Sequence, residues 1–289
     1  MTTGAFRSAE GAETVRRLYR KVLDGWPVPV CELRLPTRQG ETFVLAFGRE
    51  DGPPVVLLHG AQANAAAWIL DAMPWAEHFR LYAVDMIGEA GFSAPSRPPL
   101  ASDAHALWLD DVMSGLGLSR AAVVGVSLGG WLALDYANHR PDFVERLALI
   151  CPAGIGRQKN FLLRAAPLLL LGSWGKRRMR ELVLGPSVTE PPEALKPLIA
   201  LMQAIGRSIR LRLETIPRLS DAELAKLKMP ILAIMCGRDV LIDSDDTRRR
   251  LRAFAPQAEI RFLPEALHFI QGQSEAVLRF LADEQARHG

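Results

Sequence analysis

One serine stands where an apolar segment suited to a strand gives way to one suited to a helix. The stretch AAVVGVSLGGWLALDYA, residues 121–137, has Ser127 at this change and a glycine two positions to either side. The motif G-x-S-x-G forms a tight, strained turn that holds the serine hydroxyl above the edge of a sheet. Side chains at 125 and 129 would collide with the neighbouring strand or helix, so glycine is expected at both. We predict that Ser127 is a nucleophile; the alternative is a structural serine that caps a helix.

A serine hydroxyl needs a base to take its proton, and the base needs an acid to orient it. In proteins with this turn, the acid and then the histidine each follow a later strand. Of the six histidines, only His268 comes directly after such a strand, AEIRFL, and we predict it as the base. The segment PILAIMCGRDVLID offers Asp239 and Asp243 as the acid. We predict Asp239, which is closer to the strand end, and interpret Asp243 as a helix cap.

Two backbone N–H groups are candidates for stabilising the oxyanion that forms when a serine attacks a carbonyl. The turn at the serine also aims the N–H of Leu128 into the same space, at a helix N-terminus where donors are unpaired. The second donor in such proteins comes from the loop after the third strand. That loop reads HGAQANAAAW, so we predict the N–H of Ala61, with a simple glycine turn as the alternative. His59, at the start of this loop, is interpreted as shaping the turn.

The elements that must position these residues alternate between strand and helix patterns. Segments typical of strands are CELRL, ETFVLAFG, PPVVLLHG, RLYAVD, RAAVVGVS, VERLALICPAG, MPILAIMCG and AEIRFL. Helical patterns separate most of them, which predicts an α/β fold with a mostly parallel central sheet flanked by helices. The first two segments are joined by PTRQG and are expected to form an antiparallel hairpin at one edge.

A long segment interrupts this alternation after the sixth strand. Residues 154–226 are helical and leucine-rich, with no convincing strand. We predict that they form a helical lid inserted into a core domain made of residues 1–153 and 227–289. A separate second domain is the alternative, but proline-rich linkers at both ends are lacking.

Composition indicates an ordinary globular protein. Of 289 residues, 49% are hydrophobic and 23% charged, and the net charge of +3 is too small to favour nucleic acid as a partner. Three widely spaced cysteines suit a reducing compartment and give no disulfide framework or metal spacing. The N-terminus lacks the apolar segment of a signal peptide, and the most apolar stretch, FLLRAAPLLLLG, is too short to span a membrane. We expect a cytoplasmic protein with a small-molecule substrate, no nucleic acid and no membrane partner; the oligomeric state stays open.

The motifs LLHG, VDMIGEAGFS, GVSLGG, MCGRD and LHF occur in the order found in the α/β-hydrolase family. The chain resembles that family over most of its length, and more narrowly its bacterial carboxylesterase-like members. Two positions depart from the family pattern. The segment from Gly88 to Ser93 is one residue longer than the usual G-x-G-x-S, so Ser93 is given no role. Cys236 stands where the turn before the acid usually has glycine.

The resemblance implies a serine hydrolase that cleaves a carboxylic ester of a small or medium apolar substrate through an acyl-enzyme. Serine at 127 excludes dehalogenases and epoxide hydrolases, whose nucleophile is aspartate. The resemblance implies no metal and no organic cofactor. Two alternatives stay open: a carbon–carbon bond hydrolase of the same fold, and a ligand-sensing module that keeps an intact triad.

Overall fold

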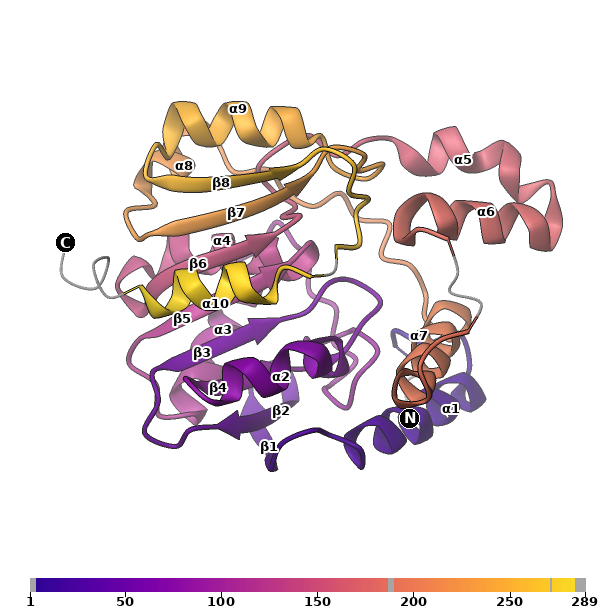
Figure 1. Ribbon diagram of the computed structural model, residues 1–289, viewed down its shortest axis with the longest axis horizontal. Coiled ribbons are helices and arrows are strands. Elements are labelled where there is room, and N and C mark those ends of the chain that lie inside the picture. The colour runs from indigo at the N-terminus through magenta and orange to yellow at the C-terminus, as the bar shows by residue number, and fades with distance from the viewer. Residues whose placement is uncertain (1–3, 187–189, 271, 284–289) are drawn as a thin grey trace.

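The computed structural model describes residues 4–186, 190–270 and 272–283. Within these ranges, eight strands form one sheet in the order β1-β2-β4-β3-β5-β6-β7-β8 (Figure 1). The strands are β1 (Val30–Thr37), β2 (Gly40–Gly48), β3 (Pro54–Leu58), β4 (Arg80–Val84), β5 (Ala121–Val126), β6 (Val144–Ile150), β7 (Ile231–Cys236) and β8 (Ala258–Leu263). Strand β2 pairs antiparallel with β1 and β4, and the other neighbouring pairs are parallel. The predicted α/β fold with an antiparallel hairpin at one edge is confirmed.

Helices cover both faces of this sheet. They are α1 (Ala9–Leu23), α2 (Ile69–Ala76), α3 (Ala104–Gly115), α4 (Leu128–His139), α5 (Phe161–Leu169), α6 (Gly172–Leu184), α7 (Lys196–Ser208), α8 (Asp221–Lys226), α9 (Ser244–Phe254) and α10 (Ser274–Ala282). In β3, Val56 and Leu58 belong to a core shared with α3, α4, α8 and α9, whereas Val55 and Leu57 share a core with α1, α2, α7 and α10. Successive side chains of a strand point to opposite faces, so a strand buried on both sides is continuously apolar.

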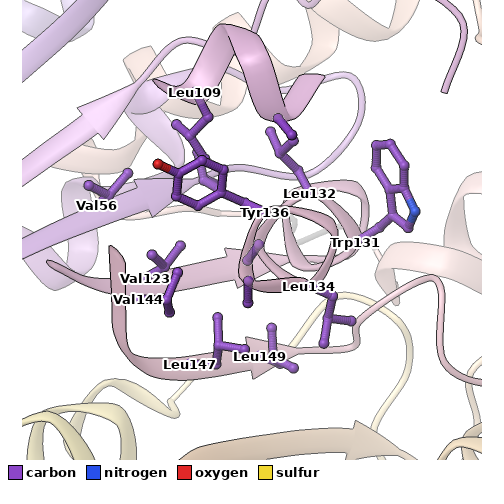
Figure 2. Packing of buried hydrophobic residues seen from close by; sticks show 14 of the residues in the cluster. Val56, Leu109, Val123, Trp131, Leu132, Leu134, Tyr136, Val144, Leu147 and Leu149 are labelled. Carbon is purple, nitrogen blue, oxygen red and sulfur yellow. The ribbon is translucent and has the colours of Figure 1, made fainter. Parts of the chain in front are cut away.

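Helix α4, which follows the serine, lies deep in the molecule. Trp131, Leu132, Leu134 and Tyr136 are all at most 1% exposed. Figure 2 shows these side chains spreading around α4 toward the apolar residues of β5 and β6 below it and toward Leu109 above it. Only Asp135, Asn138 and His139, near the C-terminal end of α4, reach solvent, so the helix has almost no polar face and a weak amphipathic pattern. The N-terminal part of the helix is buried, which fixes the position of its N-terminus.

The helices between β6 and β7 pack against different parts of the molecule. Helices α5 and α6 lie at one end of the molecule, beyond the ends of the strands (Figure 1). Helix α7 packs against α1, where Leu201 and Ile205 are at most 2% exposed. Helix α8 lies beside α9 and buries Leu224. The role of residues 154–226 as a lid stays a prediction. Residues 1–3 and 284–289, at the two ends of the predicted core domain, lie outside the described ranges.

No helix in the described part of the chain is long and apolar enough to cross a membrane.

Candidate active site

Ser127 occupies a strained position between β5 and α4. Its φ is 52° and its ψ is −108°, a region that a residue with a side chain rarely adopts. Such a conformation costs about 1–3 kcal/mol and persists only where its surroundings hold it. The Ser127 N–H donates to the carbonyl of Ile150 at 2.9 Å, and its carbonyl accepts the N–H of Ala153 at 3.1 Å. Ile150 is the last residue of β6 and Ala153 lies three residues beyond it, so the neighbouring strand and the segment after it hold the turn.

The glycines on either side allow this turn to pack against its neighbours. A Cβ at Gly125 would lie 2.5 Å from the carbonyl oxygen of Gly129. A Cβ at Gly129 would lie 2.2 Å from the carbonyl oxygen of Leu58, and 2.5 Å from that of His59. These are backbone atoms that cannot move aside, so a side chain at either position would displace the turn. The contact at Gly129 also joins the serine turn directly to the end of β3.

A chain of hydrogen bonds runs from Ser127 through His268 to Asp239. The Nε2 atom of His268 lies 3.0 Å from the hydroxyl oxygen of Ser127, and its Nδ1 atom lies 2.7 Å from Oδ2 of Asp239. A buried carboxylate is an acceptor, so Nδ1 carries the ring proton and Nε2 is free to accept from the hydroxyl. The side chains of His268 and Asp239 are only 11% and 1% exposed. The structure therefore brings together the three side chains that the sequence selected.

Asp239 is held in place by groups from the turn that follows it. Its Oδ1 accepts the N–H groups of Leu241 at 2.7 Å and Ile242 at 3.0 Å. Lys159 donates from Nζ to the carbonyl of Asp239 at 2.6 Å, a contact that the sequence did not indicate. One carboxylate oxygen is thus engaged by the backbone, and the other is left to orient the histidine.

His59 determines how the loop after β3 is oriented; residues 59–64 are called the oxyanion loop below. Its Nε2 accepts the N–H of Met86 at 3.0 Å, so Nδ1 carries the proton and donates to the carbonyl of Gly60 at 2.8 Å. Burial lowers the pKa of His59 to about 4, which keeps the ring neutral at pH 7. The Gly60 carbonyl and the Ala61 N–H belong to the same planar peptide and point in opposite directions. The ring therefore fixes the direction of the Ala61 N–H.

One predicted oxyanion donor follows the serine in the chain, and the other belongs to a loop that packs beside it. A Cβ at Gly60 would lie 3.7 Å from the Cβ of Ser127, which places the residue before Ala61 beside the serine turn. Leu128 is the first residue of α4, so its N–H has no acceptor within the helix. Two donors at a helix start and in an adjoining loop can hold a negatively charged oxygen.

Asp85, which the sequence analysis did not single out, organises the loop after β4. Its carboxylate accepts the Tyr19 hydroxyl at 3.0 Å and the N–H groups of Ala65 and Phe92 at 2.8 Å each. Burial raises the pKa of Asp85 to about 6. Ser93 bonds the same residue, donating to its carbonyl at 2.6 Å. Ser93 therefore has a structural role. The sequence alone did not assign one, because the Gly88–Ser93 segment is one residue longer than the family pattern.

One group of side chains in the described part of the chain is close enough to share a metal ion. The ligand atoms of Cys151, Asp239 and His268 lie within 4.8 Å of one another. A thiol must lose its proton to bind a metal, but the contact with Cys236 and burial raise the pKa of Cys151. Asp239 and His268 already bond each other. We therefore assign no metal to this group.

The chain is similar to a known protein family and to two curated proteins. The model of the alpha/beta hydrolase family matches residues 55–280. Two curated proteins from Bacillus subtilis are similar over nearly their whole length. The uncharacterized carboxylesterase nap is 29% identical over 92% of this chain and 91% of its own. Carboxylesterase YbfK is 28% identical over 96% of each chain.

Two solved structures resemble this chain over nearly its whole length. The crystal structure of carboxylesterase CesB (YbfK) from Bacillus subtilis matches with a TM-score of 0.80 and 27% identity, covering 95% of this chain and 99% of the other. The crystal structure of naproxen esterase from the same organism matches with a TM-score of 0.79 and 26% identity, covering 97% of each chain. Both the sheet and the helices around it are therefore shared with proteins described as esterases.

Proposed function

This chain belongs to the alpha/beta hydrolase family, and from that premise we propose that it is a serine carboxylesterase acting through an acyl-enzyme intermediate. The observation that carries the proposal is the hydrogen-bonded chain from Ser127 through His268 to Asp239. Ester hydrolysis is also the activity named for the relatives that match nearly the whole chain.

In the proposed mechanism, His268 Nε2 takes the proton of the Ser127 hydroxyl as its oxygen attacks the ester carbonyl. The N–H groups of Ala61 and Leu128 stabilise the negative charge on the carbonyl oxygen. The imidazolium, stabilised by Asp239, then gives its proton to the leaving alcohol, and an acyl group stays on the serine. A water molecule, deprotonated by the same histidine, hydrolyses the acyl-enzyme and restores the free hydroxyl.

The names of the structural neighbours support a proposal for the substrate class. We propose carboxylic esters of small or medium apolar molecules, because one structural neighbour is described as a naproxen esterase. Neighbours described as meta-cleavage product hydrolases are 19–20% identical, so they share the fold and give no support to carbon–carbon cleavage. A panel of p-nitrophenyl esters, lactones and vinylogous diketones separates these chemistries. Turnover of the diketones without turnover of any ester would contradict the proposal.

Labelling with a fluorophosphonate tests the nucleophile directly. We expect one adduct on the intact protein, located by peptide mapping at Ser127, because among the serines in the described ranges only Ser127 has a histidine nitrogen at 3.0 Å. Ser127→Ala should lose both the label and ester turnover while keeping its melting temperature. Ser93→Ala is the matched control, since the Ser93 hydroxyl is hydrogen-bonded like that of Ser127, but to the backbone groups of Phe43 and Asp85 and to no histidine. A ligand-sensing protein would instead acylate once and hold its product.

A further inference from the structure

A buried carboxyl group beside the oxyanion loop has no part in the mechanism above. Glu89 follows β4 and is only 6% exposed. Its Oε2 accepts the N–H of Gln62 at 2.8 Å. Gln62 has a φ of 56°, a left-handed conformation uncommon for a residue other than glycine. The bond from this N–H to Glu89 therefore helps to stabilise a backbone conformation that is costly for a residue with a side chain.

The bond to Gln62 acts on the donor one residue earlier. Ala61 lies between two peptide planes, and each is held by one side chain. His59 bonds the carbonyl of the first plane at 2.8 Å, and Glu89 bonds the N–H of the second, also at 2.8 Å. Each peptide unit turns as a rigid plane, so a rotation that carries the Ala61 N–H away from the serine must disturb one of these bonds.

We propose that Glu89 is a positioning residue that holds the oxyanion loop, and with it the Ala61 N–H, in the conformation that receives the substrate's oxyanion. The inference rests on the proposed esterase function, because the oxyanion forms when Ser127 attacks a substrate carbonyl. It adds to that function a residue outside the Ser127–His268–Asp239 chain. The role requires an acceptor that reaches Gln62, and does not require contact with substrate.

The surroundings of Glu89 suit a fixed acceptor. Arg97 donates from Nε to the carbonyl of Gly88 at 2.7 Å, which anchors the residue just before Glu89. Burial raises the pKa of Glu89, whereas the Gln62 N–H and the charges of Arg97 and Arg212 lower it. Glu89 also lines a small cavity whose wall includes Leu128, the other predicted donor. The buried Glu89 side chain therefore bonds the loop of one predicted donor and lines the same cavity as the residue of the other.

Three substitutions of Glu89 separate the effects of the position of its acceptor oxygen, of its charge and of its burial. Glu89→Gln keeps an oxygen at the same reach and loses the charge. Glu89→Asp keeps the charge but draws the carboxylate back by one methylene, away from Gln62. Glu89→Leu removes the acceptor. His105→Leu is the matched control, because His105 lines the same cavity and is 4% exposed, but its ring packs edge-on against Trp131 of α4.

Turnover and the affinity of a transition-state analogue are the readouts. Loss of a single oxyanion donor lowers kcat about 10²–10³-fold. We expect Glu89→Leu and Glu89→Asp to lower kcat on p-nitrophenyl butyrate about 10²-fold with little change in KM. An alkyl boronic acid, which forms an anionic tetrahedral adduct with the serine, should lose affinity by a similar factor. Glu89→Gln should keep most of the wild-type kcat and boronate affinity. His105→Leu should keep the wild-type kcat and boronate affinity even if its melting temperature changes.

Two results would overturn the positioning role. The first is that Glu89→Asp has the kcat and the boronate affinity of the wild type. Glu89→Asp retains the buried charge, so this variant can be used if Glu89→Leu does not fold. The other is an equal loss in Glu89→Gln and Glu89→Leu, which would assign the effect to charge. Ser127→Ala separates this test from that of the esterase function. Unchanged turnover in Ser127→Ala refutes the esterase mechanism, whereas an inactive Ser127→Ala with a normal Glu89→Asp refutes only the role of Glu89.

Discussion

Asp239 and Asp243 are four positions apart, and their hydrogen bonds give them different tasks. Asp239 receives the ring N–H of His268 at 2.7 Å. Asp243 accepts the N–H of Asp246 at 3.0 Å, as an N-cap of α9 does. The first contact orients the proposed base, and the second satisfies a donor at a helix start.

We expect Asp239→Asn to lower ester turnover about 10⁴-fold, because an asparagine at this position favours the wrong tautomer of the histidine. The melting temperature should change little. Asp243→Asn should leave turnover nearly intact and lower stability by at most about 1 kcal/mol, since asparagine is itself a capping residue. Turnover and thermal melts of the two variants check both statements. An inactive Asp243→Asn with an active Asp239→Asn would show that the acid is misassigned.

The order of residues along the chain was enough to select Ser127, His268 and Asp239. The carboxyl ends of parallel strands meet at one edge of a sheet, so residues after β5, β7 and β8 come together there. Glu89 could not be selected in this way. It bonds the backbone of Gln62, 27 positions away, and a backbone contact leaves no mark on the partner's residue type. The extra residue in the Gly88–Ser93 segment was the one available signal.

At the scale of elements, the segment between β6 and β7 also shows what the sequence alone cannot predict. Its leucine-rich pattern predicted helices, but periodicity does not tell which surface an apolar face will contact. Helix α7 packs on α1, whereas α5 and α6 pack on each other. Gly175 of α6 is so near α5 that a Cβ there would lie 1.6 Å from the carbonyl oxygen of Leu168. The pair of α5 and α6 is therefore one unit, called the α5–α6 hairpin.

We expect the α5–α6 hairpin to set acyl-chain preference without supplying the reacting groups. Its contact with the loop of the predicted base is a bond from the Phe269 N–H to the carbonyl of Val183 at 3.2 Å. Replacing residues 161–184 by a short glycine–serine linker should shift preference among p-nitrophenyl acetate, butyrate and octanoate. Fluorophosphonate labelling of Ser127 should survive. Loss of labelling in a folded variant would count against this division of roles.

The serine turn itself gives a test of close packing. We expect Gly129→Ala to lower stability by about 3 kcal/mol, because its Cβ would lie 2.2 Å from the carbonyl oxygen of Leu58. Turnover should fall as well, since Leu58 leads into the oxyanion loop. Gly206→Ala in α7 is the control: nothing lies within 4 Å of its Cβ, so helix propensity should raise stability by about 0.5–1 kcal/mol. Urea unfolding measures both, and equal effects at the two glycines would contradict the packing argument.

At the scale of the whole molecule, buried titratable groups couple stability to pH. Burial lowers the pKa of His59 to about 4; burial, with a smaller effect from the charge of Arg212, lowers that of His105 to about 4. Burial raises the pKa of Asp85 to about 6. The two kinds of group act in opposite directions. Below pH 6.5 the unfolded chain protonates histidines that the folded protein keeps neutral, whereas the folded protein protonates Asp85 before the unfolded chain does.

His105 allows one of these contributions to be isolated. Because its folded pKa is depressed, its contribution to stability is present above pH 6.5 and is lost as the pH falls toward 4. Between pH 7 and pH 5 this loss amounts to about 2 kcal/mol. The free energy of unfolding of His105→Leu should therefore fall less than that of the wild type, by about this difference, over the same interval. His78→Gln, at an exposed histidine, should follow the wild-type curve. Urea unfolding at pH 7, 6 and 5 checks the expectation. Parallel curves for His105→Leu and the wild type would mean that the imidazole is hydrated in the folded protein, as a water molecule reaching its unpartnered Nδ1 would allow.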